Sequence, residues 1–336
     1  FFGIPRLSTG DGRPTNAVYG FMNILLKVLS EETPDRICVA FDLDRKKLRR
    51  TAMYADYKGT RKPMPEELHL QVPVVQQLLG AMQVPVITLE GYEADDIQGT
   101  VAKMARDLSD AHAYILTGDR DLLQLVDRQI TLLIPKTKKG GTETEVYREA
   151  EVEEKYGVSP EGYLNMKALM GDASDNIPGV PGVGEKTASK LIRTFGSLEE
   201  VLAHADEAGG AKLCGNLKEF AEQARLSLWL ATIKTDCELA GEAALLGDES
   251  FATPEFIAYL KEFELKSLLA RVMKNKAPLA AEKEAGAAEN AAEAAVKKGT
   301  FKTAKLRYAD ALKADPTSFK AALGMAKMCL KTDVTE

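Results

Sequence analysis

Three short apolar runs of this sequence each lead directly into acidic residues, and this alternation constrains the fold more than any other feature. The runs are RICVAFD, which ends at Asp42, VPVIT, which precedes EGYEADD, and AYILTG, which precedes Asp119. Segments with apolar residues at helical spacing separate the runs. Strands that alternate with helices are typical of a parallel α/β sheet. We therefore expect an α/β domain over residues 1–150.

Carboxylates follow each of these strands, and two more stand in the segment GDASDN. Ligands of an open parallel sheet bind beyond the carboxyl ends of its strands, so these side chains would share one edge. Carboxylates with no His or Cys nearby select hard cations, and two Mg²⁺ or Mn²⁺ ions can clamp a phosphodiester for attack by water. The alternative is that each acid caps a helix or lies in a solvated loop. The candidate metal ligands are Asp42, Glu93, Asp95, Asp96, Asp119, Asp121, Asp172 and Asp175.

Residues 151–273 contain no further apolar run that predicts a strand, and we expect a helical domain there. Its most specific motif is NIPGVPGVGEKTASKL, in which Gly179, Gly182 and Gly184 allow close backbone approach. Lys186 and Lys190 lie one turn apart on the following helix, whose N-terminus offers free N–H groups to a phosphate. Such a turn can hold a DNA backbone without reading bases. The alternative is a plain connector between two helices.

The segment from Arg45 to Lys62 is strongly basic and contains YADYKGTRK. Aromatic side chains among basic ones suit stacking on unpaired bases and contact with phosphates. A solvated basic helix is the alternative. The residues concerned are Tyr54, Tyr57, Lys58, Arg61 and Lys62.

Composition excludes several classes of protein. No run approaches the roughly 18 apolar residues of a membrane span, and no signal peptide pattern is present. The four cysteines form no CxxC pair, which is typical of reduced thiols in a cytoplasmic protein. Residues 274–298 are rich in Ala, Glu and Lys and suit a linker. Residues 299–336 resemble part of a tetratricopeptide repeat through Gly299, Phe301, Ala304, Tyr308, Ala311 and Pro316.

The motifs VAFD, YKGTR, EGYEADD, TGDRDLLQLV and GDASDNIPGVPGVGEKTA, in this order, resemble the 5′→3′ exonuclease domains of bacterial DNA polymerase I, which belong with the flap endonucleases and phage 5′-nucleases. The resemblance runs from Phe1 to about Met273. It implies a PIN-like α/β domain followed by a helical domain with a helix–three-turn–helix motif. It also implies removal of 5′ flaps and RNA primers in replication and repair, with two Mg²⁺ or Mn²⁺ ions.

Carried over to this sequence, the resemblance assigns a first metal to Asp42, Glu93, Asp95 and Asp96, and a second to Asp119, Asp121, Asp172 and Asp175. Lys58, Arg61 and Tyr57 become the candidate catalytic residues, with Lys58 assisting the scissile phosphate. Arg50, Tyr54 and Lys62 would belong to an arch over the 5′ strand. Gly179, Gly182, Gly184, Lys186 and Lys190 would bind the downstream duplex, where the family often places a potassium ion.

The sequence departs from the family pattern in three places. Family members begin with a strand that ends in Asp, whereas this chain starts at the FF dipeptide, so we expect a nuclease domain without its first strand. The arch reads LDRKKLRRTAMY, in which only Arg50 and Tyr54 align well. No polymerase follows Met273; the tetratricopeptide-like tail stands there instead and could recruit a protein partner.

We therefore predict a monomeric, structure-specific 5′→3′ exonuclease or flap endonuclease that acts on DNA with a 5′ flap, a nick or an RNA primer. Three alternatives remain at this stage. The chain could bind branched DNA without cutting it, because the first Asp-bearing strand is missing. It could be an interaction protein that acts through its tail. It could be a PIN-type ribonuclease, although the NIPGVPGVGEKTA turn argues for a grip on duplex DNA.

Overall fold

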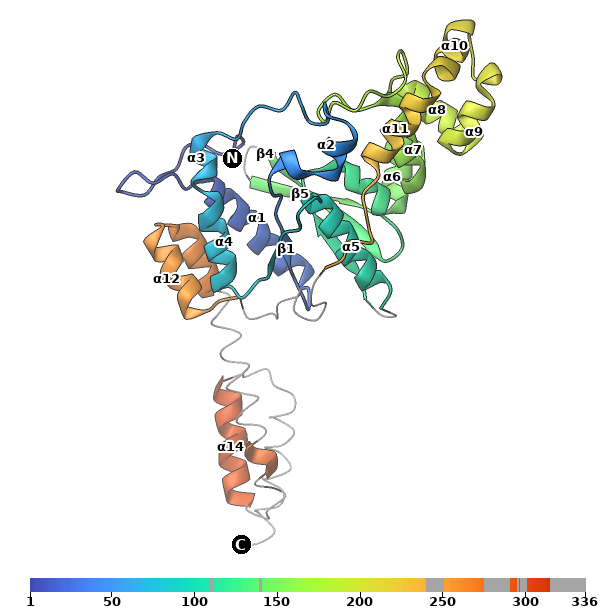
Figure 1. The fold of residues 1–336 in the computed structure, drawn as a ribbon. Coiled ribbons are helices and arrows are strands. Elements are labelled where there is room, and N and C mark those ends of the chain that lie inside the picture. Colours follow the sequence, from blue (N-terminus) through green and yellow to red (C-terminus); the bar gives the residue numbers. More distant parts are fainter. Residues whose placement is uncertain are drawn as a thin grey trace. The chain divides into compact units, whose positions relative to one another are not determined.

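The computed structural model describes residues 1–108, 111–138, 141–239, 251–274, 291–294, 296 and 301–314. Contacts divide the chain into two compact units, Phe1–Phe251 and Ala252–Glu336. The first unit begins with α1 (Asn16–Glu32), β1 (Val39–Ala40), η1 (Arg45–Lys47), α2 (Arg49–Met53), α3 (Glu66–His69), α4 (Val72–Ala81), β2 (Val86–Ile87), α5 (Ala94–Arg106), β3 (Ala113–Leu116), η2 (Arg120–Leu125), β4 (Ile130–Lys138) and β5 (Gly141–Tyr147) (Figure 1). It continues with α6 (Glu149–Tyr156), α7 (Pro160–Met170), α8 (Glu185–Phe195), α9 (Leu198–Ala203), η3 (Ala205–Glu207), α10 (Ala211–Glu219) and α11 (Ala221–Ala231).

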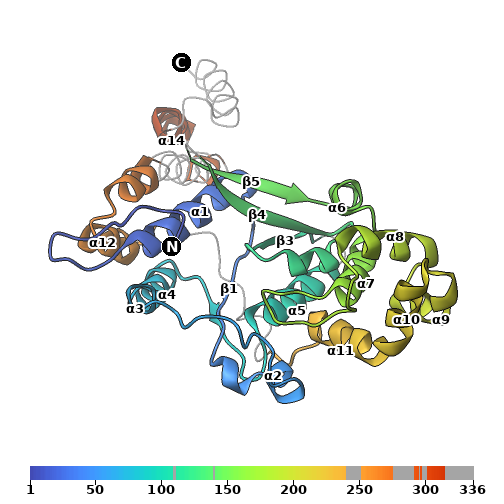
Figure 2. The same ribbon diagram turned by 90° about the horizontal axis from the view of Figure 1, so that it is seen from above.

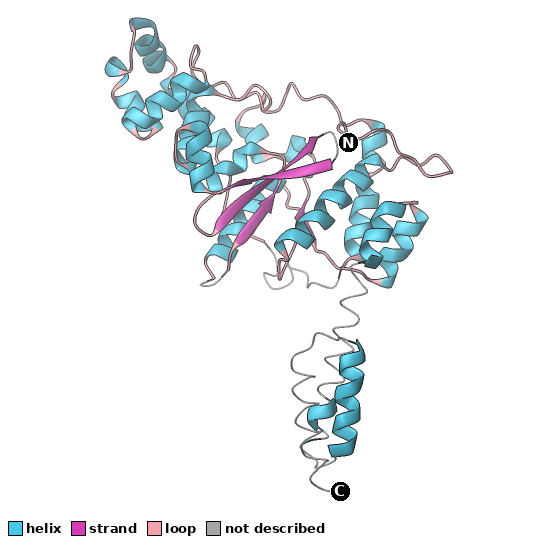
Figure 3. Cartoon of the chain, turned by 180° about the vertical axis from the view of Figure 1, so that it is seen from behind, coloured by secondary structure: helices cyan, strands magenta, loops and turns pink. Residues whose placement is uncertain are grey.

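The strands form two small sheets, drawn in magenta in Figure 3. β1 pairs with β2 in parallel, with Val39 opposite Val86, and β3 pairs with β4 in parallel, with Ala113 opposite Ile130. The predicted parallel pairing is therefore confirmed for these strands. β5 runs antiparallel to β4 and adds one antiparallel strand beside the parallel β3–β4 pair. Its sequence GTETEVY carries no apolar run, so pairing with β4 rather than local pattern makes it a strand.

One hydrophobic core joins the strands to the helices that follow them. Ile115 of β3 and Leu132 of β4 belong to the same buried cluster as Leu169 of α7 and Leu191 of α8. α7 and α11 lie between the strands and the group formed by α8, α9 and α10 (Figures 1 and 2). Residues on either side of position 150 thus belong to one compact unit.

Two breaks interrupt the helices that follow residue 149. The segment after residue 149 bends at Gly157, which has φ +72°, and resumes at Ser159, whose hydroxyl accepts a hydrogen bond from the backbone N–H of Gly162. A left-handed glycine followed by a serine cap ends one helix and begins the next. A second break separates α10 from α11 at Phe220. These bends direct α7 along η2 and toward the segment that carries Asp172.

The second unit consists of helices wherever it is described. It contains α12 (Pro254–Glu262), a helix over 266–274 and α14 (Phe301–Ala314). Ala304, Tyr308 and Ala311 of the expected tetratricopeptide pattern are buried on α14. Gly299, Pro316 and most of the expected linker lie outside the described residues, so the repeat stays a prediction. No described helix has the length and apolarity needed to cross a membrane.

Gly179 offers a test of how tightly the Gly/Pro turn is packed. Its φ is +62°, and an added Cβ would overlap the backbone nitrogen of Gly171. Gly182 has φ +80°, but a Cβ there would meet only Asn216 Nδ2 at 3.6 Å. We expect Gly179→Ala to lower the free energy of unfolding by about 2–5 kcal/mol and Gly182→Ala by about 1–2 kcal/mol. Urea unfolding followed by Trp229 fluorescence measures both; equal losses would contradict the packing argument.

Candidate active site

The acidic residues that follow β1 and β2 meet at the N-terminus of α5. Glu93 caps this helix, and its backbone N–H donates to the Asp96 carboxylate at 3.0 Å. Asp42, which follows β1, accepts a hydrogen bond of 2.7 Å from the backbone N–H of Ala94. The parallel pairing of β1 with β2 thus brings their acidic ends together, as the sequence predicts.

Arg50 of α2 reaches into this group and is buried. Its Nη1 donates to Glu93 at 2.8 Å and to Asp96 at 2.6 Å, and its Nη2 donates to Asp96 at 2.7 Å. The remaining donors bind backbone oxygens at the C-terminal end of α11, Nε to Leu230 at 2.9 Å and Nη2 to Thr232 at 2.6 Å. All five N–H groups of the guanidinium are therefore occupied. Arg50 ties α2, α5 and the end of α11 together.

This geometry changes two of the sequence-based assignments. Arg50 was expected to contact DNA, but it has no donor left for a phosphate. Asp96 was expected to hold a metal, yet its Oδ1 accepts from Arg50 and from the Lys234 N–H, and its Oδ2 accepts from Arg50 and from the Glu93 N–H. Hydrogen bonds from Arg50 hold the pKa of Asp96 below its usual value despite burial. We therefore treat both residues as supports of the site.

Lys58 and Tyr57 cover the outer side of Glu93. The Tyr57 hydroxyl donates to Glu93 at 2.9 Å, and the Lys58 ammonium donates to the other oxygen of the same carboxylate. Lys58 also lies 3.5 Å from the Asp175 carboxylate, and its backbone N–H donates to the Asp175 carbonyl at 2.8 Å. The φ of Lys58 is +53°, which is uncommon for a residue other than glycine. Contacts to Asp175 hold this conformation, so the sheet side and the GDASDN segment are joined here.

A second lysine makes the corresponding link farther along the chain. Lys167 of α7 lies 2.9 Å from Asp121 and donates to the Asp172 carboxylate. Sequence reasoning missed this residue. The available signal was a single charged side chain within the apolar stretch YLNMKALM, five positions before Asp172.

Asp95 lies among other carboxylates of the site. Burial, followed by repulsion from Asp119, Glu93 and Asp42, raises its pKa to about 8, although Lys58 opposes the shift. Among the described residues, no hydrogen bond to the Asp95 carboxylate is formed. Burial and the neighbouring Asp119 likewise raise the pKa of Asp121, to about 6, although Lys167 opposes the shift. An added cation would relieve this excess of negative charge.

The donor set fits a hard cation, since it consists of carboxylate oxygens. Within the described ranges, however, no three Asp, Glu, His or Cys side chains are arranged as a group that could hold a metal ion. Lys58 and Lys167 instead share the carboxylates between them. The chemical type of these side chains therefore suits Mg²⁺ or Mn²⁺. In this structure, however, Glu93, Asp121 and Asp172 are paired with lysine ammonium groups.

The predicted DNA-contacting residues divide into exposed and buried ones. Gly182, Gly184, Lys186 and Lys190 are exposed, and the N-terminus of α8 carries no side-chain cap. Val180 and Val183 anchor the turn in the core. Gly179 differs from the expectation: it is buried, and its N–H donates to the Ser227 hydroxyl at 3.0 Å. Its flexibility serves packing rather than contact with DNA.

Within the basic segment, Lys62 and Arg61 are exposed, whereas Tyr54 is half-buried against the cluster of Leu48 and Tyr57. Arg61 donates to the Asp175 carboxylate. Lys62 therefore keeps the exposure that a phosphate contact requires, and Tyr54 has only part of its ring available.

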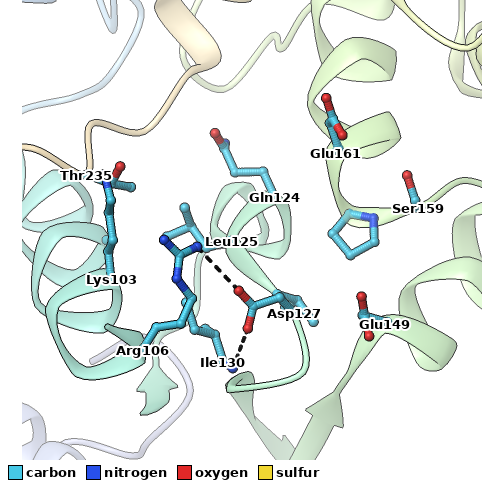
Figure 4. A pocket seen from close by; sticks show the side chains of 13 residues that line it. Lys103, Arg106, Gln124, Leu125, Asp127, Ile130, Glu149, Ser159, Glu161 and Thr235 are labelled. Carbon is cyan, nitrogen blue, oxygen red and sulfur yellow. Dashed lines mark hydrogen bonds and ion pairs between the residues drawn. The ribbon is translucent and has the colours of Figure 1, made fainter. Parts of the chain in front are cut away.

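A separate pocket of about 550 Å³ lies along α5, beyond the acidic N-terminal turn of that helix (Figure 4). Lys103 and Arg106 line one wall, and Glu149 and Glu161 lie on the other. Arg106 pairs with Asp127 at 3.5 Å. None of the predicted metal or catalytic residues lines this pocket.

Comparisons with known proteins agree along most of the chain. Residues 1–157 match the model of the 5′-3′ exonuclease N-terminal resolvase-like domain, and residues 158–251 match that of the 5′-3′ exonuclease C-terminal SAM fold. DNA polymerase I of Bacillus subtilis is 45% identical over 277 residues, which is 82% of this chain and 31% of that protein. DNA polymerase I of Geobacillus stearothermophilus is 49% identical over 236 residues, 70% of this chain and 26% of that protein. The chain thus spans about a third or less of these relatives.

Solved structures share the fold. A zinc-bound T5 5′-exonuclease superposes with a TM-score of 0.56 at 21% identity, over 79% of this chain and 91% of the T5 chain. Human GEN1 in complex with Holliday junction DNA gives a TM-score of 0.51 at 13% identity, over 83% of this chain and 70% of GEN1. At these identities the likeness supports the arrangement of the elements.

Substitution of Arg50 tests whether this residue holds the acidic site together. Replacing Arg50 with Met would leave buried Asp96 without a cation and Glu93 with Lys58 alone, and we expect the free energy of unfolding to fall by about 3–5 kcal/mol. Arg50→Lys keeps the charge but not the five-donor fork, so it should recover part of the loss. The control is Arg225→Met, which removes an exposed pair with Glu199 and should change little. Chemical unfolding of the three variants measures the effect, and an Arg50→Met protein as stable as the control would refute it.

Proposed function

Because the chain belongs to the 5′-3′ exonuclease family, we propose that it is a divalent-metal-dependent, structure-specific nuclease that hydrolyses DNA phosphodiester bonds at 5′ flaps, nicks or primer ends. The observation that carries the proposal is the gathering of carboxylates around the first turn of α5. Asp42 contacts this turn, and Asp119, Glu93 and Asp42 all act to raise the pKa of Asp95. The T5 structure with bound zinc supports a role for metal in this fold.

The proposal gives each group of residues a task. Asp42, Glu93, Asp95 and Asp119 would hold one cation, and Asp121, Asp172 and Asp175 would complete the site for a second. When bound, two such ions lower the pKa of an attacking water molecule and offset charge on the leaving oxygen. The resemblance assigns Lys58, Arg61 and Tyr57 to the scissile phosphate, and all three lie beside the proposed metal ligands Glu93 or Asp175. Arg50 and Asp96 keep these groups in place.

The exposed Gly182–Gly184 turn and the start of α8 would hold the downstream duplex. Free N–H groups at a helix N-terminus attract phosphate, and Lys186 and Lys190 add charge on the same helix. A potassium ion at this turn is part of the proposal on the resemblance alone. The GEN1 complex with junction DNA supports binding of branched DNA by this fold.

The remaining assignments rest on the family. We place the protein in the bacterial cytoplasm, in primer removal and repair, and expect it to act as a monomer. The tetratricopeptide-like segment 299–336 would serve for contact with a protein partner.

A flap assay tests the activity. We expect this chain to release a labelled 5′ flap in Mg²⁺ and to stop when EDTA is added. Asp119→Asn combined with Asp121→Asn should reduce the rate by more than about 100-fold, since loss of outer metal partners alone costs about 10–100-fold. DNA binding without cleavage would favour a branched-DNA-binding protein, and absence of both would reject the proposed function.

The proposed binding of duplex DNA by the Gly182–Gly184 turn and α8 leads to a separate prediction. Lys186→Ala combined with Lys190→Ala should weaken binding to flap DNA of any sequence. The slope of log affinity against log salt concentration should fall by about 1 for each phosphate that the variant no longer neutralises. Lys103→Ala on α5, outside the turn, is the matched control. Fluorescence anisotropy at several salt concentrations gives both slopes, and an unchanged slope in the double variant would remove the turn from the DNA interface.

A further inference from the structure

Two buried lysines each link a carboxylate on the strand side of the acidic site to a carboxylate of the GDASDN segment. Lys58 links Glu93 of the sheet side to Asp175, and Lys167 links Asp121 of the sheet side to Asp172. Their exposed fractions are only 7% and 6%. The proposed function uses Lys58 at the substrate, whereas it gives Lys167 no task.

Lys167 is held as an ammonium. Burial alone would lower its pKa, but the adjacent carboxylates of Asp121 and Asp172 raise it above its ordinary value. A buried charge is retained when it is paired and hydrogen-bonded in this way. Lys167 lies on α7, whose packing against η2 and α11 fixes where its side chain emerges.

Lys167 supplies a single positive charge to two carboxylates. Its ammonium lies 2.9 Å from Asp121 and is also paired with Asp172. A divalent cation would bring two positive charges to the same oxygens. It could not bind both carboxylates while the ammonium lies between them, which agrees with the finding that no three described acidic side chains form a metal-holding group.

We propose that Lys167 is an internal counter-ion of the Asp121–Asp172 pair, and that a divalent cation binds there only by displacing its ammonium. The inference rests on the proposed metal dependence. It adds one step to metal binding, in which the cation replaces the lysine as the partner of the two carboxylates. Without metal, the ion pairs of Lys167 hold α7 and the GDASDN segment against η2. With metal, the same carboxylates change partners, so cation binding and release of the lysine are one coupled exchange.

Lys167→Met tests the exchange by a measurement that does not depend on cleavage. In EDTA, the variant should melt at a lower temperature than the unchanged chain, because two carboxylates lose their partner. In Mg²⁺, it should regain more stability than the unchanged chain does. Calorimetric titration should show Mg²⁺ binding about tenfold more tightly, within the roughly 5–150-fold range typical of coupled binding. Lys218→Met removes an exposed pair with Asp206 and is the matched control.

A second measurement uses the unchanged chain and so does not depend on how the variant folds. Acylation of lysines, read by mass spectrometry, should label Lys167 slowly in EDTA and faster in Mg²⁺, while Lys218 reacts alike in both. Equal or weaker Mg²⁺ binding by Lys167→Met, or unchanged labelling of Lys167 in a chain that binds Mg²⁺, would overturn the exchange and leave the proposed function standing. Absence of any Mg²⁺ binding would overturn both.

Discussion

The hydrogen bonds of Arg50 are the interaction on which the geometry of the acidic site depends. A guanidinium with five fixed donors can satisfy Glu93, Asp96 and two backbone carbonyls at once, which an ammonium cannot do. It pairs with two buried carboxylates at the start of α5 and also fixes the end of α11 beside them. The positions of Tyr57 and Lys58 follow, because both pack onto the Glu93 carboxylate that Arg50 orients.

Local pattern predicted much of this molecule. The runs before Asp42 and Glu93 form β1 and β2, whose parallel pairing brings their acids together, because strand direction and alternation with helices are visible in the chain. The run before Asp119 forms β3, which pairs with β4 in the other sheet. The sequence pattern did not show which residues and strands would pair with one another. β5 exists because β4 pairs with it, and Arg50 is buried because α5 and α11 provide acceptors. Basic residues look alike in sequence, whether they face a phosphate or an internal carboxylate.

The sequence also could not show which glycines of the Gly/Pro turn would be buried and which would be exposed. All three were expected to approach DNA, yet Gly179 approaches the backbone of Gly171 while Gly182 and Gly184 are exposed. Lys167 was missed for a related reason. Its role depends on Asp121, which is distant in the sequence but lies 2.9 Å away in the structure. A site built from several elements is only partly visible before these elements are assembled.

The hydrophobic core that extends from β3 and β4 to α7 and α8 has a consequence for how such proteins are divided. Two family models meet between residues 157 and 158, although buried side chains on both sides of that junction pack together. Either half produced alone would expose apolar surface that the other covers, which favours aggregation. The junction therefore divides one compact unit, and a recombinant protein trimmed there would be expected to need both pieces for solubility.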